Sequence, residues 1–427
     1  MGDLRNLAEQ ALRSMAHRTM ASSDGNQYQN LVRSTKTSSI LGGFPTEPAD
    51  LQDDLIIHGR VYYPKNIDLR SWSKKIEEHD LSSLASELET VDGAYAFVHP
   101  SDDALIVGRD PLGVKPLYMA RNENGVGVAS EAKALTSVGL SKVVSIPPGV
   151  YEIHLDYQKR YEIRSWKRTD QIPTNMDEAS TKVLELLTDA VHNRLSEERR
   201  ICVGFSGGLD SSLLALLVSK QIDPDLVTVC TEGSYDQVEA EKAARQLDLS
   251  LTVRIVDKAI VSETLKSLPY LIESHGLMDL GISMALHLAA KEAHKMNCRC
   301  LMLGQLADEL FGGYGRYLRL YQSQGREYVH DALCSDVLNA YHTNFERDDK
   351  AASPYAELNL PYASTTLVDY AMRLPPELKI NTSQEIRKTV LRKAAVKAGL
   401  PDDIAFGAKK AVQFSSGLQK MIKRLSF

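Results

Sequence analysis

Cysteine is scarce in this chain, with 5 residues among 427. An odd, sparse set of cysteines argues against a disulfide framework. Cys298 and Cys300 form the one closely spaced pair, and no further cysteine or histidine joins them at metal-ligand spacing. We therefore expect reduced thiols in buried strands, as in an intracellular protein, with metal binding by the pair as the alternative. The five are Cys202, Cys230, Cys298, Cys300 and Cys334.

Long apolar runs and an excess of positive charge are also absent. No apolar run approaches the roughly 18 residues of a membrane span, and the first residues contain no apolar signal-peptide core. The formal net charge of −6 gives no sign of a nucleic-acid groove or of affinity for an anionic membrane. We expect a cytoplasmic protein with neither nucleic acid nor membrane among its partners. Its 427 residues allow two or three domains.

The N-terminal part of the chain is predicted to be rich in short strands. Residues 1–39 are polar after a short helical pattern and are expected to form an extension. Residues 40–168 contain short alternating segments bounded by turns, which predict a β-rich domain, and 167–176 are expected to be a polar linker. The expected strands are 55–63, 93–99, 104–108, 116–120, 125–129 and 149–154, with helices at 81–88 and 130–138.

The pattern changes to alternating strands and helices in the C-terminal part, residues 169–427. Such alternation predicts a parallel sheet covered by helices on both faces, with ligands bound beyond the carboxyl ends of the strands. The expected strands are 201–205, 226–230, 251–255 and 300–303, and the expected helices are 177–195, 211–220, 236–247 and 283–296.

A loop of serines and glycines follows strand 201–205 and precedes a helix. A helix N-terminus offers unpaired N–H groups and a positive dipole end to an anion, and the glycines allow close approach of a phosphate. Asp210 would repel that phosphate unless a divalent cation lies between them. The alternative is an ordinary turn that caps a helix. The loop residues expected to hold the phosphate are Ser206, Gly207, Gly208, Asp210, Ser211 and Ser212.

A second acidic loop follows strand 300–303. Gly304 begins it and is expected to contact the nucleotide, and Asp308 lies at a predicted helix start, on the same sheet edge as Asp210. Two carboxylates at one phosphate site are typical of Mg²⁺ binding, so we predict that Asp210 and Asp308 hold this metal. The alternative is that Asp308 and Glu309 are first-turn acids favoured by the helix dipole.

These motifs carry a resemblance to a known family. The loop Ser206–Ser212 resembles the pyrophosphate loop of the N-type ATP pyrophosphatases, and together with Gly304–Tyr317 and Leu391–Leu418 it resembles the synthetase domain of asparagine synthetases. Upstream motifs resemble the family's class II glutamine amidotransferase domain, which implies an Ntn-type αββα sandwich over 40–168 and an ATP pyrophosphatase domain over 169–427. The upstream motifs are Asp92–Phe97, Arg109–Tyr118, Ala129–Glu131 and Pro147–Gly149.

The N-terminal domain departs from the family pattern. Class II glutaminases use a cysteine at position 2 as nucleophile, whereas this sequence has Gly2 and no cysteine before Cys202. The family's oxyanion-hole string Asn-Gly-Glu is replaced by His58-Gly59-Arg60. Because a thiolate and oriented donors are central to this acyl transfer, we expect glutamine hydrolysis to be lost. An N-terminal truncation or a mis-assigned start codon is the alternative.

The synthetase domain departs too. Gln305 stands where the resemblance implies a glutamate that handles the proton of the ammonia nucleophile, and an amide cannot accept that proton. Glu357 is a candidate replacement base, as in the related β-lactam-forming synthetases; the alternative is a structural carboxylate. The resemblance also implies that Lys409 neutralises charge on the α-phosphate. Asp236 either contacts ATP or caps its helix.

The implied function is ATP-dependent amide formation. A carboxylate, aspartate by resemblance, would be activated as an acyl-adenylate with release of pyrophosphate and then amidated by ammonia, with ATP and Mg²⁺ required. A synthetase acting on another acid or amine, including a β-lactam type, and a non-catalytic nucleotide-binding paralogue are the alternatives. A homodimer and a separate ammonia-supplying protein are possible partners.

Overall fold

The computed structural model contains two compact units, each described here by itself. Unit 1 comprises Met1–Ser165 with Ala340–Asp349, and unit 2 comprises Trp166–Asn339 with Lys350–Phe427. The structure describes residues 7, 10–11, 13–15, 31–34, 40–43, 51–52, 55–65, 67–101, 103–123, 125–163, 171–172, 174–196, 198–407 and 416–425.

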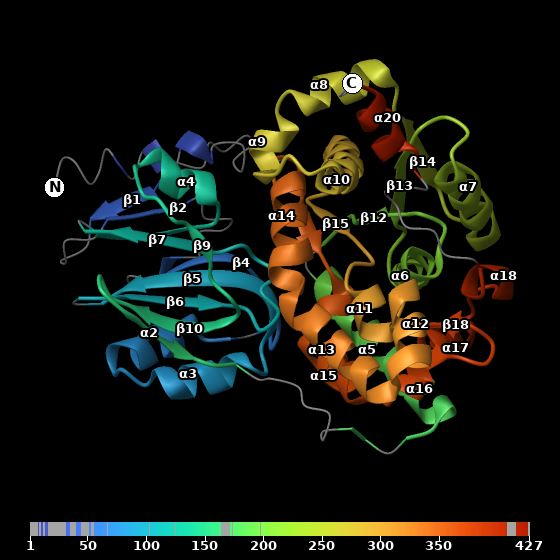
Figure 1. Ribbon diagram of the computed structural model, residues 1–427, viewed down its shortest axis with the longest axis horizontal. Coiled ribbons are helices and arrows are strands. Elements are labelled where there is room, and N and C mark those ends of the chain that lie inside the picture. The colour runs from blue at the N-terminus through green and yellow to red at the C-terminus, as the bar shows by residue number, and fades with distance from the viewer. Residues whose placement is uncertain are drawn as a thin grey trace. The chain divides into compact units, whose positions relative to one another are not determined.

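Unit 1 is built around two antiparallel sheets that face one another (Figure 1). The larger has six strands in the order β11-β10-β6-β5-β4-β3, and the smaller has three in the order β8-β7-β9. A further pair, β1 and β2, is antiparallel as well. The strands are β1 (Leu31–Ser34), β2 (Ile40–Gly43), β3 (Leu51–Gln52), β4 (Leu55–Tyr63), β5 (Asp92–Pro100), β6 (Leu105–Arg109), β7 (Tyr118–Asn122), β8 (Gly125–Ala129), β9 (Val144–Ser145), β10 (Gly149–Ile153) and β11 (Gln158–Tyr161).

Helices cover the outer face of each sheet and complete four layers. Helices α2 (Leu69–Glu77) and α3 (Leu81–Leu88) pack on the six-stranded sheet, and α4 (Ala132–Ser137) packs on the three-stranded one. Successive side chains of β5 point to opposite faces of the sheet, as they do in any strand. Phe97 therefore lies in the core with α2 and α3, whereas Ala96 lies in the core between the two sheets. This arrangement confirms the predicted αββα sandwich.

The turn after β6 shows why the Arg109–Tyr118 motif needs its particular residues. Asp110 is fully buried and accepts hydrogen bonds from the backbone N–H groups of Tyr95, Leu112, Val114 and Lys115, at 3.0–3.2 Å. Burial raises the pKa of this carboxyl to about 6, although these hydrogen bonds oppose the rise. One side chain thereby fixes the path of the whole turn.

The charged and phenolic groups of the same motif bind the segment Ala340–Asp349. Arg109, which is fully buried, pairs with Glu346 at 3.1 Å, and Lys115 pairs with Asp349 at 3.0 Å. The Tyr118 hydroxyl donates to Glu346 Oε2 at 2.6 Å. Removing one partner of a buried ion pair typically costs about 3–5 kcal/mol. The motif is therefore explained by this internal docking, without reference to glutamine chemistry.

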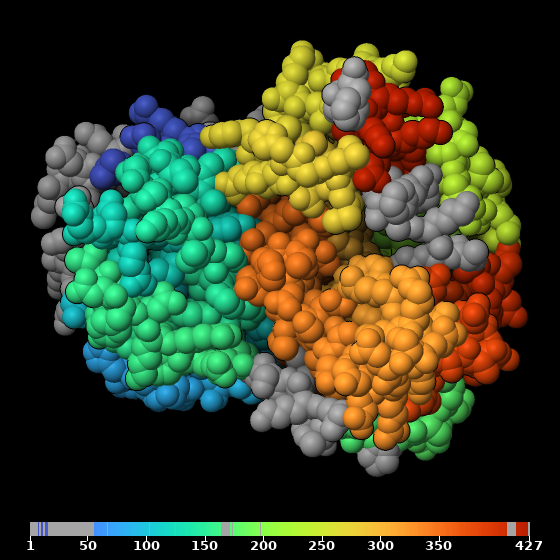
Figure 2. Space-filling view, viewed as in Figure 1, coloured from blue at the N-terminus to red at the C-terminus, as the bar shows by residue number. Residues whose placement is uncertain are grey.

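Unit 2 is built on a five-stranded parallel sheet in the order β14-β13-β12-β15-β16. Connections between parallel strands are right-handed, which places α6 and α7 on one face and α10 on the other. Figure 2 shows a face of unit 2 formed largely by α8 and α9 (yellow) and by the α12–α13 region (orange). The strands are β12 (Cys202–Gly204), β13 (Asp225–Cys230), β14 (Leu251–Ile255), β15 (Cys300–Met302) and β16 (Glu357–Asn359), and a separate hairpin joins β17 (Ile380–Asn381) to β18 (Ile386–Arg387).

The helices that follow residue 175 are numerous and mostly short. One stretch, η4 (Tyr341–Phe345), is a π-helix, and another, η5 (Pro361–Ala363), is a 3₁₀-helix. The α-helices are α5 (Met176–Leu195), α6 (Leu209–Ser219), α7 (Tyr235–Leu247), α8 (Lys258–Leu265), α9 (Leu268–Ile272), α10 (Leu277–Lys295), α11 (Ala307–Phe311), α12 (Gly315–Gln324), α13 (Arg326–Ala340), α14 (Glu346–Ala352), α15 (Thr365–Arg373), α16 (Pro376–Lys379), α17 (Thr389–Ala398), α18 (Asp402–Ala405) and α20 (Leu418–Leu425).

The predicted parallel sheet is confirmed, although the sequence patterns missed its strand β16, and in unit 1 they missed α2 and short strands such as β9 and β11. Strand β16 has three residues, too few for a periodic pattern. Helix α2 was missed although Asp68 caps it, accepting from the Arg70 N–H at 3.0 Å. The five cysteines are buried, as expected. Among the described residues, no helix combines the length and hydropathy needed to cross a bilayer.

Lys379 on α16 offers a test of the packing in unit 2. Its side chain is fully buried, and Nζ has no hydrogen-bond partner within the described residues. Burial lowers the pKa of this amine from 10.5 to about 8. Because the folded-state pKa lies below the unfolded-state value, the lysine destabilises the fold below pH 8, and this penalty disappears between pH 8 and 10.5.

We expect Lys379→Met to raise the free energy of unfolding by about 3 kcal/mol at neutral pH, since each pKa unit corresponds to about 1.4 kcal/mol. The gain should shrink as the pH approaches 10.5. Urea unfolding at several pH values measures it, with Lys220→Met as control because the Lys220 amine donates to the Ala398 carbonyl at 2.8 Å. A gain independent of pH would contradict the explanation.

Candidate active site

The Ser206–Ser212 loop lies where the sequence analysis placed it, between β12 and α6. Gly208 is the N-cap residue of α6, and Gly207 has φ = +71°, a conformation that favours glycine. A Cβ on Gly207 would lie 2.4 Å from the Glu239 carbonyl oxygen of α7. Glycine is therefore required there both by the turn and by the close packing of α7.

Two hydroxyl groups fold the loop onto itself. Ser211 Oγ accepts from the Ser206 N–H at 3.1 Å and lies 3.1 Å from Ser206 Oγ. The Gly208 N–H also faces Ser206 Oγ, at 3.4 Å. These contacts preorganise a concave turn at a helix N-terminus, the arrangement that favours binding of an anion.

The second loop approaches the first closely at the same sheet edge. It runs from β15 into α11, and Asp308 lies in the first turn of that helix. Leu306 precedes α11 with φ = +75°, an uncommon conformation for a residue with a side chain. A Cβ on Gly304 would lie only 3.0 Å from Asp210 Cβ. Gly304 thus allows Asp210 and Asp308 to converge.

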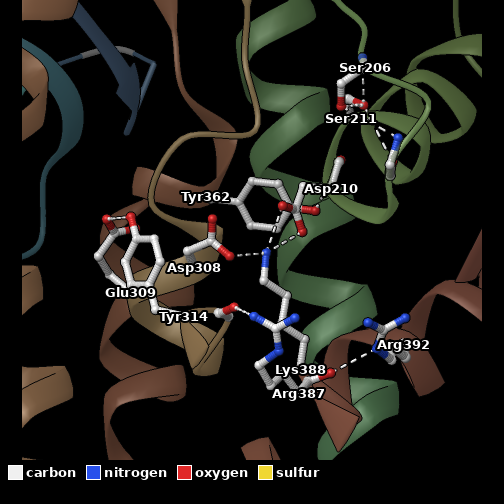
Figure 3. A network of polar contacts seen from close by, with 12 residues as sticks. Ser206, Asp210, Ser211, Asp308, Glu309, Tyr314, Tyr362, Arg387, Lys388 and Arg392 are labelled. Carbon is white, nitrogen blue, oxygen red and sulfur yellow. Dashed lines mark hydrogen bonds and ion pairs between the residues drawn. The ribbon is translucent and has the colours of Figure 1, made fainter. Parts of the chain in front are cut away.

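Lys388 lies between these two carboxylates (Figure 3). Its Nζ is 2.6 Å from each carboxylate oxygen of Asp210 and 2.7 Å from Asp308 Oδ1. The lysine side chain is 3% exposed, against 19% and 18% for the two aspartates. A positive charge therefore already occupies the point on which both predicted metal ligands converge.

The backbone around Lys388 fixes this position. Lys388 has φ = +58° and is the N-cap residue of α17. Its neighbour Arg387 donates from Nη1 to the Gly313 carbonyl at 2.7 Å, and the Arg387 carbonyl accepts from Arg392 Nε at 2.7 Å. An αL residue with a side chain costs energy and commonly marks a functional site.

Aromatic residues surround the acidic pair. The buried Tyr362 hydroxyl donates to the Asp210 carbonyl at 3.3 Å, and burial raises the pKa of Tyr362, with the nearby aspartates adding to the effect. Glu309 points away from Lys388 in Figure 3 and accepts from the Tyr314 hydroxyl at 2.6 Å. Both phenols therefore stay protonated and act as hydrogen-bond donors.

The donor set fits a Mg²⁺ ion bound together with a phosphate. Two carboxylates converge on one point that already attracts a cation, and Mg²⁺ is usually held by one or two carboxylates plus phosphate oxygens and water. Within the described ranges, no group of three or more acidic, histidine or cysteine side chains could hold a metal by itself. Asp210 and Asp308 would thus need ligands from elsewhere, and a phosphate bound in the adjacent loop would supply them.

Other predicted residues have different positions. Asp236 is buried in the first turn of α7, but Ser234 is the cap, since its Oγ accepts from the Gln237 N–H at 3.3 Å. Ser212 is fully buried and its Oγ has no hydrogen-bond partner in the described part of the chain, so this hydroxyl lies beneath the loop surface. Lys409 lies outside the described residues.

Glu357, the predicted replacement base, lies on the edge strand β16. It is the first residue of β16 and pairs with Cys300, whereas Gln305 follows the carboxyl end of β15. The residue of β16 level with that end is Asn359, which pairs with Met302. The structure therefore places the backbone of Glu357 at the amino end of a three-residue strand, and its role as a base stays a prediction. The motif match identified the residue but could not show which end of a strand it occupies.

Lys388 is the site residue that the sequence analysis missed. One signal was available: a lysine directly before a helix lies at the positive end of the helix dipole, where acidic residues are preferred. A cation at such a place indicates an anionic partner elsewhere in the fold. The partners are 178 and 80 residues away in sequence, from the difference between 388 and the positions of Asp210 and Asp308, so only the folded chain identifies them.

Fold and site together define a two-domain protein with an N-terminal antiparallel amidotransferase sandwich and a C-terminal parallel-sheet domain of the adenine nucleotide α hydrolase type. The asparagine synthase family matches residues 182–325 and 319–425, more than half of the chain, and the glutamine amidotransferase domain family matches 49–137. The chain therefore belongs to the asparagine synthase family.

Known relatives agree with this assignment. A Methanocaldococcus jannaschii protein named as a glutamine-hydrolyzing asparagine synthetase is 29% identical, over 93% of this chain and 84% of the relative. Escherichia coli asparagine synthetase B (glutamine-hydrolyzing) is also 29% identical, over 78% of this chain and 62% of its own length. The chain thus spans less than two thirds of that second relative.

Gly313 tests the convergence of charges. A Cβ on it would lie 1.8 Å from Asp308 Oδ1 and 2.3 Å from Lys388 Cε. We expect Gly313→Ala to separate these groups and to lower the free energy of unfolding by about 1–3 kcal/mol, as overpacking does. Thermal unfolding measures this. The control is Gly315→Ala, whose Cβ would have its nearest neighbour at 3.5 Å; equal stability of the two variants would contradict the expectation.

Proposed function

We propose that this protein is an ATP-dependent, AMP-forming amide synthetase that activates a carboxylic acid, with aspartate as the first substrate to test. The observation that carries the proposal is the convergence of Asp210 and Asp308 beside the preorganised Ser206–Ser212 loop, at the carboxyl edge of a parallel sheet. Ligands of such sheets bind at this edge.

The residues have distinct roles in the proposed reaction. The loop backbone and the N-terminus of α6 hold the pyrophosphate portion of ATP, and Lys388 contributes positive charge to the same region. The substrate carboxylate attacks the α-phosphorus, pyrophosphate leaves, and an amine then attacks the acyl carbon to give an amide and AMP. Mg²⁺ on Asp210 and Asp308 would neutralise phosphate charge when bound.

The nitrogen source in this proposal is free ammonia. His58 and Gly59 stand in place of the family's Asn-Gly string on β4, and His58 Nδ1 lies 3.2 Å from Ser130 Oγ. Gly59 has φ = +111°, and a Cβ there would lie 2.0 Å from the Ala94 carbonyl oxygen. The glycine is thus explained by strand packing, and a histidine ring cannot replace the amide donor of asparagine in the same geometry.

Two alternatives share the ATP site. Because Gln305 cannot accept a proton as a glutamate does, a synthetase for another acid or amine is the second candidate. A nucleotide-binding protein without amide synthesis is the third. A homodimer, a separate ammonia-supplying protein and a cytoplasmic location stay predictions.

ATP–pyrophosphate exchange with a panel of carboxylic acids tests the first half-reaction. We expect exchange with aspartate, and we expect Asp210→Asn to lower it at least 100-fold, as loss of a key electrostatic group does in other active sites. Exchange with a different acid alone would favour the second candidate, and nucleotide binding without exchange would favour the third.

A matched control is available on α5. Asp177 is exposed and pairs with Lys397 at 2.8 Å, at the C-terminal end of α17 and away from Lys388. Asp177→Asn removes the same charge as Asp210→Asn and should leave exchange within about twofold of the parent protein, because an exposed pair contributes little. Equal losses in both variants would contradict a special role of Asp210.

Glutamine hydrolysis tests the proposed nitrogen source. With the full chain, ATP and the acid, we expect amide formation to depend on added ammonium and to be negligible with glutamine. Glutamate release, measured by a coupled dehydrogenase assay, should stay at the background of a protein-free sample. Glutamate released at the rate of amide formation would refute the proposal of ammonia dependence.

A further inference from the structure

We propose that the Lys388 ammonium and a divalent cation compete for Asp210 and Asp308, so that metal binds strongly only together with the nucleotide. This inference deepens the proposed function and rests on it only for the identity of the nucleotide. It concerns whether the metal can bind before the nucleotide. Two carboxylates without Lys388 would not make metal binding depend on the nucleotide.

The competition follows from the positions of the atoms. Every hydrogen-bonding or ionic contact that the described residues give to Lys388 Nζ goes to these two carboxylates, at 2.6, 2.6 and 2.7 Å. Mg²⁺ bound by the same oxygens needs distances near 2.0–2.1 Å. An ammonium in contact with three of those oxygens fills the space between them, so both cations cannot occupy it together.

Charge balance shows why the metal alone is a poor competitor. Lys388 offsets one of the two negative charges that the carboxylates carry. Adding Mg²⁺ without moving the lysine would bring two cations to the same oxygens. If Lys388 moved away and no anion received it, its charge would lose its partners. The side chain is only 3% exposed, so burying this unpaired charge would be unfavourable.

A polyphosphate removes this obstacle. Phosphate oxygens bound in the Ser206–Ser212 loop, which contains Asp210, would offer Lys388 new negative partners. The ammonium can then turn toward the phosphate while the backbone of Lys388 stays in place. Lys388 then no longer occupies the space between the two carboxylates, and a metal bound there would gain phosphate oxygens as further ligands.

The anchoring of Lys388 favours a side-chain movement over a loop movement. Arg387 holds the Gly313 carbonyl at 2.7 Å, and α17 begins directly after Lys388. A lysine side chain has a flexible four-carbon stem and a compact ammonium, so the ammonium can reorient without a backbone change. The exchange therefore needs no lid or domain closure.

The consequence is positive coupling between metal and nucleotide. Thermodynamic linkage requires that each ligand strengthen the other by the same factor, typically about 5–150-fold. A site made of two free carboxylates would instead bind a divalent cation in the absence of nucleotide. The two situations are distinguished by metal binding alone, without any turnover.

Mn²⁺ is a suitable probe because its free concentration can be followed by electron paramagnetic resonance. With the full chain at neutral pH, we expect weak Mn²⁺ binding without nucleotide and at least tenfold tighter binding with α,β-methylene-ATP, after correction for Mn²⁺ bound to the free analogue. Equal Mn²⁺ affinity with and without the analogue, when the analogue is shown to bind, would overturn the proposal.

Lys388→Met provides the second measurement, since methionine keeps much of the length and removes the charge. We expect this variant to bind Mn²⁺ without nucleotide at least tenfold more tightly than the parent protein, and to gain thermal stability when Mn²⁺ is added. The control Lys397→Met removes an ammonium from the other end of the same helix and should behave as the parent does. Unchanged Mn²⁺ affinity in folded Lys388→Met would overturn the proposal.

These outcomes separate the inference from the proposed function. If no acid supports pyrophosphate exchange, the amide synthetase proposal fails while the Mn²⁺ measurements still decide the competition. If exchange is normal but Lys388→Met binds Mn²⁺ no better than the parent, the competition fails alone. Circular dichroism of the variant shows whether it is folded, and the comparison of the parent protein with and without nucleotide does not depend on any variant.

Discussion

The contact of one buried ammonium with two carboxylates is the interaction on which the rest of the site depends. Asp210, Asp308 and Lys388 come from three different helix starts, and the ion pairs at 2.6–2.7 Å hold those starts together. Two carboxylates that contact the same ammonium lie close enough to repel one another in a poorly hydrated place. The lysine makes their convergence tolerable before any ligand is present, and it does so at the position where a metal would act.

Many local features of unit 2 serve this convergence. Gly304 and Gly313 leave space that a methyl group would fill, and Leu306 and Lys388 adopt left-handed backbone conformations directly before helices. Each feature is unfavourable or restrictive by itself, whereas together they bring three charges to one point. Such concentration of strain and close packing is typical of a functional site, because the surrounding fold must overdetermine conformations that a free chain would avoid.

In unit 1, the motif residues make structural contacts within the unit. Its Arg109–Tyr118 motif is explained by internal contacts: Asp110 organises a turn, and Arg109 binds Glu346 within the same unit. Gly59 is likewise explained by packing against Ala94. The residues of this motif are thus explained by the fold of the sandwich itself, whichever groups carry out chemistry on it. A motif can persist for the contacts it makes, which is why family resemblance and activity have to be judged separately.

The sequence by itself determined the two kinds of domain, the four predicted strands of the parallel sheet and the Ser206–Ser212 loop, because these depend on local periodicity, turn residues and helix N-terminal chemistry. It also placed Asp210 and Asp308 on one sheet edge, since parallel strands end together. Only the tertiary structure decided which charge lies between them, because Lys388 arrives from a distant segment. It also decided that Glu357 lies at the other end of its strand, because register depends on pairing with Cys300 and not on the residues of the strand alone.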